Sequence, residues 1–165
     1  MKLIICPLAQ LDTALKADRS HVLSLISPDA DAPDIKSTHR LVLRFNDISG
    51  PRDGLTAASA ADIQSLIAFA RSWDGTAPLV IHCWAGISRS TAAAYIIACL
   101  NHAPGSEQDL AQQLRRIAPQ ATPNPLMIAL ADEILLRDGR MIQAVAEIGR
   151  GCEAGCGELF TLEIR

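Results

Sequence analysis

Apolar residues recur along the first half of the chain in short runs bounded by Pro, Asp or Asn. Three of these runs, residues 3–6, 21–26 and 41–45, have the length and the borders of β-strands. A fourth run, residues 79–81, is apolar on both faces, which is typical of a central strand in a covered sheet. This fourth strand leads directly to Cys83.

Between and after these runs, the apolar residues follow the period of a helix. Residues 59–73 carry one apolar stripe, and residues 88–100 are apolar nearly throughout, which predicts a helix with protein on most sides. Amphipathic stretches predict three further helices near residues 106–117, 124–134 and 141–148. Strands that alternate with helices favour an α/β fold, with a mainly parallel central sheet flanked by helices.

Length and composition fit one domain. With 165 residues and 49% hydrophobic composition, the chain can form one substantial core, which we assign to residues 1–150. The Gly-rich end, residues 151–165, is expected to be a loosely structured tail. The net charge of −3 argues against nucleic acid or a membrane surface as a partner. Pro7 interrupts an amino-terminal apolar run that is too short for a signal peptide, so we expect a cytoplasmic protein.

The five cysteines are odd in number and scattered, so a disulfide framework is not expected. Cys6 and Cys99 sit in apolar runs and are interpreted as core residues. Cys152 and Cys156 lack a second Cys or His pair at a zinc-like spacing, so no metal site is predicted there. They are assigned to the tail.

The sequence around Cys83 predicts an anion site. A strand that ends at Cys83 and a helix that begins near Arg89 place a six-residue turn at a helix N-terminus, where unpaired N–H groups and the helix dipole attract an anion. Gly86 permits close backbone approach, Arg89 can bind two phosphate oxygens, and Ser90 can offer its hydroxyl to the sulfur. The same surroundings favour a thiolate nucleophile.

A purely structural interpretation is the alternative: Cys83 would be a buried thiol and Arg89 a solvated arginine. The flanking His82 and the apolar helix favour a functional site. The predicted phosphate-binding residues are Trp84, Ala85, Gly86, Ile87, Ser88 and Arg89.

The segment His82-Cys83-Trp84-Ala85-Gly86-Ile87-Ser88-Arg89-Ser90 resembles the His-Cys-x5-Arg-Ser/Thr motif of protein tyrosine phosphatases, most closely that of the dual-specificity branch. The resemblance covers roughly residues 45–136. It implies a dual-specificity phosphatase-like fold and hydrolysis through a phosphocysteine, without metal or cofactor. In that family the Cys attacks phosphorus and the Arg binds the phosphoryl oxygens. An Asp upstream protonates the leaving oxygen and then activates water.

The resemblance assigns three further residues. Asp47 follows a strand directly and is the preferred general acid, while Asp53, beside a glycine turn, is the alternative. His82 corresponds to the family's His, thought to fix the loop. Asn124 resembles the Asn that braces the phosphate loop, although a helix N-cap explains this residue equally well.

Two features that the sequence lacks indicate the class of substrate. No Lys lies in the phosphate loop, unlike phosphoinositide phosphatases, and no long recognition segment deepens the pocket. We therefore expect a phosphorylated protein or small phosphomonoester as substrate, chiefly phosphotyrosine and also phosphoserine or phosphothreonine; nothing in the sequence specifies an oligomeric state. The alternatives are a phosphate-binding module with little turnover, and an arsenate reductase or sulfur transferase, for which Cys152 and Cys156 are weak resolving candidates.

Overall fold

The computed structural model describes residues 1–16, 21–37 and 39–164, in which strands and helices alternate. The elements are β1 (Lys2–Pro7), η1 (Leu8–Gln10), α1 (Leu11–Ala14), β2 (His21–Ile26), β3 (His39–Arg44), α2 (Ala60–Ser72), β4 (Leu79–Cys83), α3 (Arg89–Leu100), α4 (Glu107–Ile117), α5 (Pro125–Ile134), α6 (Arg140–Ile148) and β5 (Phe160–Glu163).

The strands of the described chain form one sheet with the order β3-β2-β4-β1-β5. The pairs of β2 with β3, β2 with β4 and β1 with β4 are parallel, and β5 runs antiparallel to β1. The expected α/β fold with a mainly parallel sheet is therefore confirmed. Parallel register brings Pro7 beside Cys83, so the carboxyl ends of β1 and β4 meet at one edge of the sheet. Active sites in such sheets lie at this edge.

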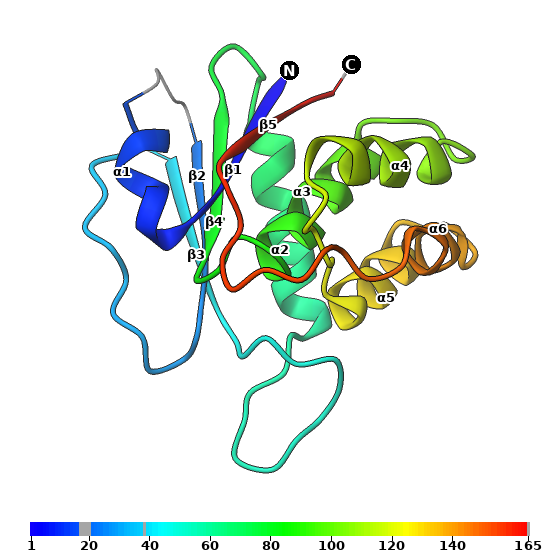
Figure 1. The fold of residues 1–165 in the computed structure, drawn as a ribbon, viewed down its shortest axis with the longest axis horizontal. Coiled ribbons are helices and arrows are strands. Elements are labelled where there is room, and N and C mark those ends of the chain that lie inside the picture. The colour runs from blue at the N-terminus through cyan, green and yellow to red at the C-terminus, as the bar shows by residue number, and fades with distance from the viewer. Residues whose placement is uncertain (17–20, 38, 165) are drawn as a thin grey trace.

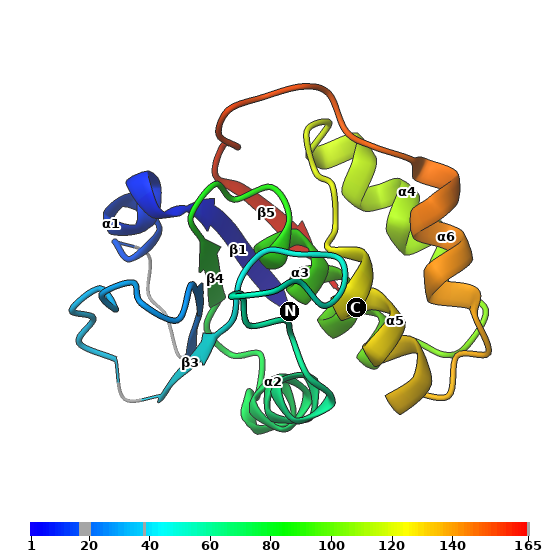
Figure 2. The same cartoon turned by 90° about the horizontal axis from the view of Figure 1, so that it is seen from below.

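Helices cover both faces of the sheet (Figure 1). The short α1 lies on one face, and the other five α-helices lie on the opposite face, as the second view also shows (Figure 2). Eleven of the twelve residues of α3 are buried, because α3 packs against β1 and β4 on one side and α4 and α5 on the other. The all-round apolar pattern of residues 88–100 thus marks the central helix, whose N-terminus points to the end of β4.

The last part of the chain differs from expectation. We predicted a loosely structured tail over residues 151–165, but Phe160–Glu163 form β5 and pair with β1. Phe160, Leu162 and Ile164 are buried against the main core. The strand was missed because it has only four residues and follows a Gly-rich segment. Its period-two alternation of apolar and polar residues was the available signal.

Burial settles the role of two cysteines. Cys6 and Cys99 are fully buried, as expected for core residues, and burial raises the pKa of each thiol to about 12. Both are therefore uncharged at neutral pH. Cys152 and Cys156 are exposed. In the described residues, no helix has the length and apolar character needed to cross a membrane.

Candidate active site

The turn between β4 and α3 is held from outside by its carbonyl oxygens. The backbone N–H of Leu8 donates to Trp84 O at 3.1 Å, that of Thr122 to Ile87 O at 2.9 Å, and that of Asn124 to Ser88 O at 3.4 Å. In a planar trans peptide the C=O and the N–H point in opposite directions. Because these carbonyls are bound on the outside, the N–H groups of the same peptides point toward the inside of the turn.

The sulfur of Cys83 lies inside this turn. The backbone N–H of Gly86 donates to Sγ at 3.2 Å, and the hydroxyl of Ser90 lies 3.2 Å from the same atom. Cys83 is only 2% exposed, at the end of β4 and the beginning of the turn. Both groups therefore lie within hydrogen-bonding distance of the sulfur.

Only glycine fits at position 86. Its φ is +70°, in the left-handed region, and an added Cβ would lie 2.6 Å from the backbone nitrogen of Pro7. The turn therefore packs directly on the end of β1.

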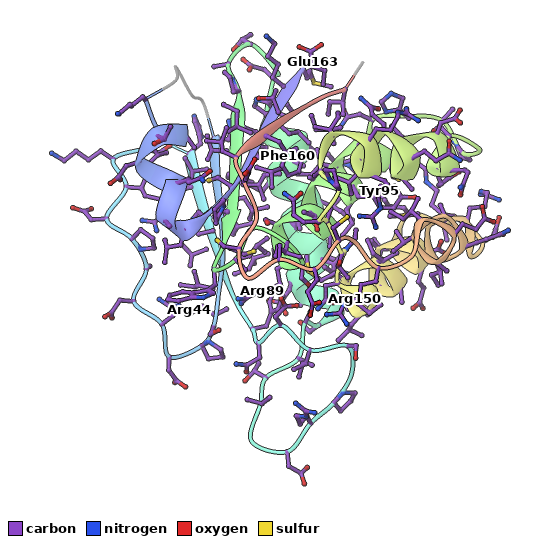
Figure 3. All side chains as sticks on the ribbon, viewed as in Figure 1. Arg44, Arg89, Tyr95, Arg150, Phe160 and Glu163 are labelled. Carbon is purple, nitrogen blue, oxygen red and sulfur yellow. The ribbon has the colours of Figure 1, made fainter. Side chains whose placement is uncertain are left out.

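Arg89 is the first residue of α3 and is 4% exposed. Its Nη1 donates to Phe45 O at 2.7 Å, which fixes the guanidinium under the turn. Its Nε is buried and has no hydrogen-bond partner among the described residues. Figure 3 shows the labelled side chain near the end of β4. A buried cationic donor of this kind is suited to an anion.

Asp47 connects three parts of the site. Its Oδ1 accepts a hydrogen bond from Ser88 Oγ at 2.7 Å and another from Asn124 Nδ2 at 2.8 Å. Its Oδ2 lies 4.0 Å from Arg89 Nε. The carboxyl group is thus beside the turn and is 37% exposed. Asp53 is exposed in the same loop, next to Gly54 with a φ of +73°.

Asn124 performs two tasks at once. Its Oδ1 accepts the N–H of Met127 at 3.0 Å, so it is the N-cap of α5. Its Nδ2 donates to Asp47 and to Ile48 O, which ties the loop after β3 to the start of α5. One end of the amide thus makes the N-cap, and the other end binds the loop that carries Asp47 instead of the phosphate loop, which Asn124 reaches only through its backbone N–H to Ser88 O at 3.4 Å.

His82 lies behind the turn with no solvent exposure. One ring nitrogen, Nε2, is 2.8 Å from Ser24 Oγ on β2. Burial, together with the positive charges of Arg40 and Arg89, lowers the pKa of His82 to about 4. The imidazole is therefore neutral at pH 7 and acts as a structural partner of β2.

Two cavities open beside the turn. One of about 510 Å³ is lined by Asp47, Ser88 and the loop that follows Asp47. The other, of about 440 Å³, is lined by Cys83, Trp84 and the loop after β2. Trp84, which lines the second cavity, is 74% exposed. The described residues hold no cluster of three or more His, Cys, Asp or Glu arranged to bind a metal ion.

Sequence reasoning missed the groups that hold the turn from outside. Leu8 and Thr122 act through their backbone N–H groups, so their side chains give no signal. Ser24 also escaped notice, although a serine in an otherwise apolar strand indicates a polar partner nearby.

The fold is shared with two solved phosphatase structures. A mouse protein described as a candidate dual specificity phosphatase, crystallised with zinc tungstate, matches with a TM-score of 0.56 and 19% identity over 81% of this chain and 79% of that chain. DUSP15 matches with a TM-score of 0.55 and 15% identity over 87% of this chain and 88% of that chain. No family model matches the chain, and no curated protein matches it. The chain therefore has the fold of dual-specificity phosphatases.

Proposed function

We propose that this protein is a cysteine-dependent phosphatase of the protein tyrosine phosphatase superfamily, most similar to its dual-specificity branch. One observation carries the proposal. The N-terminus of α3 brings together the sulfur of Cys83, the N–H of Gly86 that donates to it, and Arg89, whose buried Nε makes no hydrogen bond among the described residues and lies 4.0 Å from Asp47 Oδ2. Phosphate oxygens require such donors, and a phosphorus atom held by them would lie next to a nucleophile.

In the first step the Cys83 thiolate attacks phosphorus, and an S–P bond forms as the P–O ester bond breaks. Arg89 and the inward N–H groups bind the three phosphoryl oxygens, where negative charge collects in the transition state. Asp47, in its protonated form, gives its proton to the leaving oxygen. Its hydrogen bonds from Ser88 and Asn124 hold the carboxyl group beside the turn.

In the second step water attacks the phosphocysteine. Asp47, now a carboxylate, accepts the proton of the water as the new P–O bond forms and the S–P bond breaks. The hydroxyl of Ser90, 3.2 Å from the sulfur, stabilises the departing thiolate. Inorganic phosphate leaves, and the enzyme returns to a thiolate and a protonated Asp47, with no metal or cofactor.

The substrate is a phosphomonoester on a protein or a small molecule. Phosphotyrosine is the preferred substrate, and phosphoserine and phosphothreonine are further ones, because the short chain has no long recognition segment that would deepen the pocket. The turn carries no Lys that would match the additional phosphates of an inositol ring.

A second candidate is arsenate reduction, in which two thiols become a disulfide as arsenate becomes arsenite. Cys156 is the thiol that comes near the turn, but its Sγ lies 3.6 Å from Ala85 O on the outer side, opposite the sulfur of Cys83, so this contact favours hydrolysis over arsenate reduction. Arsenite release with loss of two thiols would identify this activity. A phosphate-binding module with little turnover would show neither reaction.

The test is phosphate release from p-nitrophenyl phosphate in EDTA by the wild type, by Cys83→Ser and by the control Cys152→Ser. Wild type and the control should be equally active. Cys83→Ser should be inactive yet still bind tungstate, since the serine hydroxyl is not ionised at neutral pH while the donors persist. Turnover by Cys83→Ser within tenfold of the wild type would overturn the role of Cys83. If neither the wild type nor any variant released phosphate, the phosphatase proposal would fail and a phosphate-binding module would be the better interpretation.

A further inference from the structure

The connection between α6 and β5, residues 149–159, runs along the candidate site instead of taking a direct path. Figure 1 shows it crossing from α6 to the end of β4 before it turns into β5. It has no regular secondary structure but is hydrogen-bonded along its length. The N–H of Gly151 donates to Thr122 Oγ1 at 3.1 Å, that of Cys152 to Pro119 O at 2.9 Å, and that of Leu159 to Gln10 Oε1 at 2.7 Å.

One residue of this connection reaches the phosphate-binding turn. The N–H of Gly157 donates to Ala85 O at 2.7 Å. Ala85 O and the N–H of Gly86 belong to the same planar peptide and point in opposite directions. Gly157 therefore holds the outer end of the peptide whose inner end donates to Cys83 Sγ at 3.2 Å.

The contact requires glycine. Gly157 is buried, and a Cβ added to it would lie 2.9 Å from Gly86 O and 3.2 Å from Ala85 O, both backbone atoms. A Cβ at 2.9 Å cannot be accommodated unless the backbone of the turn or of the connection moves. Gly155, two residues earlier, is exposed and has open space around its Cβ position.

We propose that Gly157 is a positioning residue for the candidate site: its N–H sets the Ala85–Gly86 peptide so that the Gly86 N–H points at the thiolate of Cys83. The inference rests on the proposed function for its catalytic meaning, but the geometry it describes can be measured without turnover. With this role, the C-terminal segment belongs to the candidate site although it lies outside the motif of residues 82–90.

The first test is alkylation of Cys83 by iodoacetamide at a series of pH values, with the modified site identified by mass spectrometry. In Gly157→Ala the midpoint of the Cys83 rate profile should move up by about one pH unit, the size expected when one hydrogen bond to a charged group is weakened. The matched control Gly155→Ala should keep the wild-type midpoint. An unchanged midpoint in a folded Gly157→Ala would overturn the proposal.

A second measurement needs no variant at position 157 and so stands if Gly157→Ala fails to fold. In a ¹⁵N NMR titration of the wild type, the amides of Gly86 and Gly157 should both report the ionisation of Cys83, while Gly155 should not. Both inflections should disappear in Cys83→Ser. A Gly157 signal that stays flat while Gly86 moves would refute the coupling.

The two proposals can fail separately. If p-nitrophenyl phosphate is not hydrolysed by the wild type but the alkylation midpoint moves in Gly157→Ala, the phosphatase assignment fails and the positioning role stands. If hydrolysis is normal and the midpoint is the same in Gly157→Ala and the wild type, the positioning role fails alone.

Discussion

Replacing Asp47 with Asn tests the general acid while leaving most of the structure intact. The amide oxygen of Asn can still accept the hydrogen bonds that Ser88 and Asn124 give to Oδ1. The change removes the charge that faces Arg89 Nε at 4.0 Å, but Asp47 is 37% exposed and water screens the pair. The cost in the free energy of unfolding should therefore be at most about 1 kcal/mol.

The expected effect on catalysis is larger and depends on the leaving group. A positioned general acid contributes about 10²–10⁴-fold, or about 2.7–5.5 kcal/mol of barrier. The phenol of tyrosine has a pKa of about 10 and needs a proton to leave, whereas a strongly acidic phenol does not. Asp47→Asn should therefore reduce kcat for phosphotyrosine by about that factor and reduce kcat for dinitrophenyl phosphate far less.

The assay compares kcat for the two substrates in the wild type, Asp47→Asn and the matched control Asp53→Asn. Asp53 lies exposed in the same loop, so its variant should retain the wild-type ratio of the two rates. Unfolding in denaturant checks that stability has changed as little as expected. If Asp53→Asn alters the ratio and Asp47→Asn does not, the general acid is Asp53 and the reasoning about this loop is wrong.

Further predictions concern Arg89, His82 and the buried ion pair of Arg137 with Glu107, for which an exposed ion pair is the control. Arg89→Lys should lower kcat/KM at least tenfold in the phosphate-release assay, because an ammonium cannot reproduce the fork of a guanidinium; an unchanged value would refute that role. The pKa of His82 is about 4 in the folded protein, below the ordinary 6.5 of the unfolded chain. Between these two pH values the unfolded chain binds a proton at His82 and the folded protein does not. The free energy of unfolding should therefore fall by about 3 kcal/mol as the pH drops from 6.5 to 4. Denaturant titrations should show a shallower fall in His82→Gln, and an equal fall would contradict a buried neutral imidazole. Arg137→Met should lower the free energy of unfolding by about 3 kcal/mol, because it removes the cation 2.8 Å from the buried carboxylate of Glu107 and leaves that carboxylate with Arg140 at 3.7 Å. Lys2→Met, at an exposed ion pair, should cost less than about 1 kcal/mol in the same experiment.

The runs of apolar residues along the sequence predicted the strand and the helix that are buried on most sides. The apolar run before Cys83 marks β4 because a strand covered on both faces is apolar on both faces. The apolar helix after Arg89 marks α3 for the same reason. By contrast, β5 was missed because its brief alternation follows a Gly-rich segment, and α1 was missed because its four residues make little more than one helical turn.

The candidate site divides in the same way. The sulfur, the glycine turn and the guanidinium lie within seven consecutive residues, 83–89, so their spacing carried the prediction. The contacts that orient them come from distant segments. Asn124 meets Asp47 across 77 positions of sequence, and Gly157 reaches Ala85 through a backbone N–H. A backbone donor has no side-chain signature, so only the tertiary structure reveals these contacts.

The antiparallel pairing of β5 with β1 has a consequence for how the protein matures on the ribosome. The N–H of Ile164 donates to Met1 O at 3.0 Å, which is a contact between residues far apart in the sequence. Contacts of such large sequence separation form slowly, because the intervening chain must first give up its conformational freedom. During translation β1 has an unpaired edge until residues 160–163 emerge, and an unpaired edge can associate with other chains. A nascent chain stalled before residue 160 should therefore be prone to aggregation although the segment from Cys83 to Arg89 has already been synthesised.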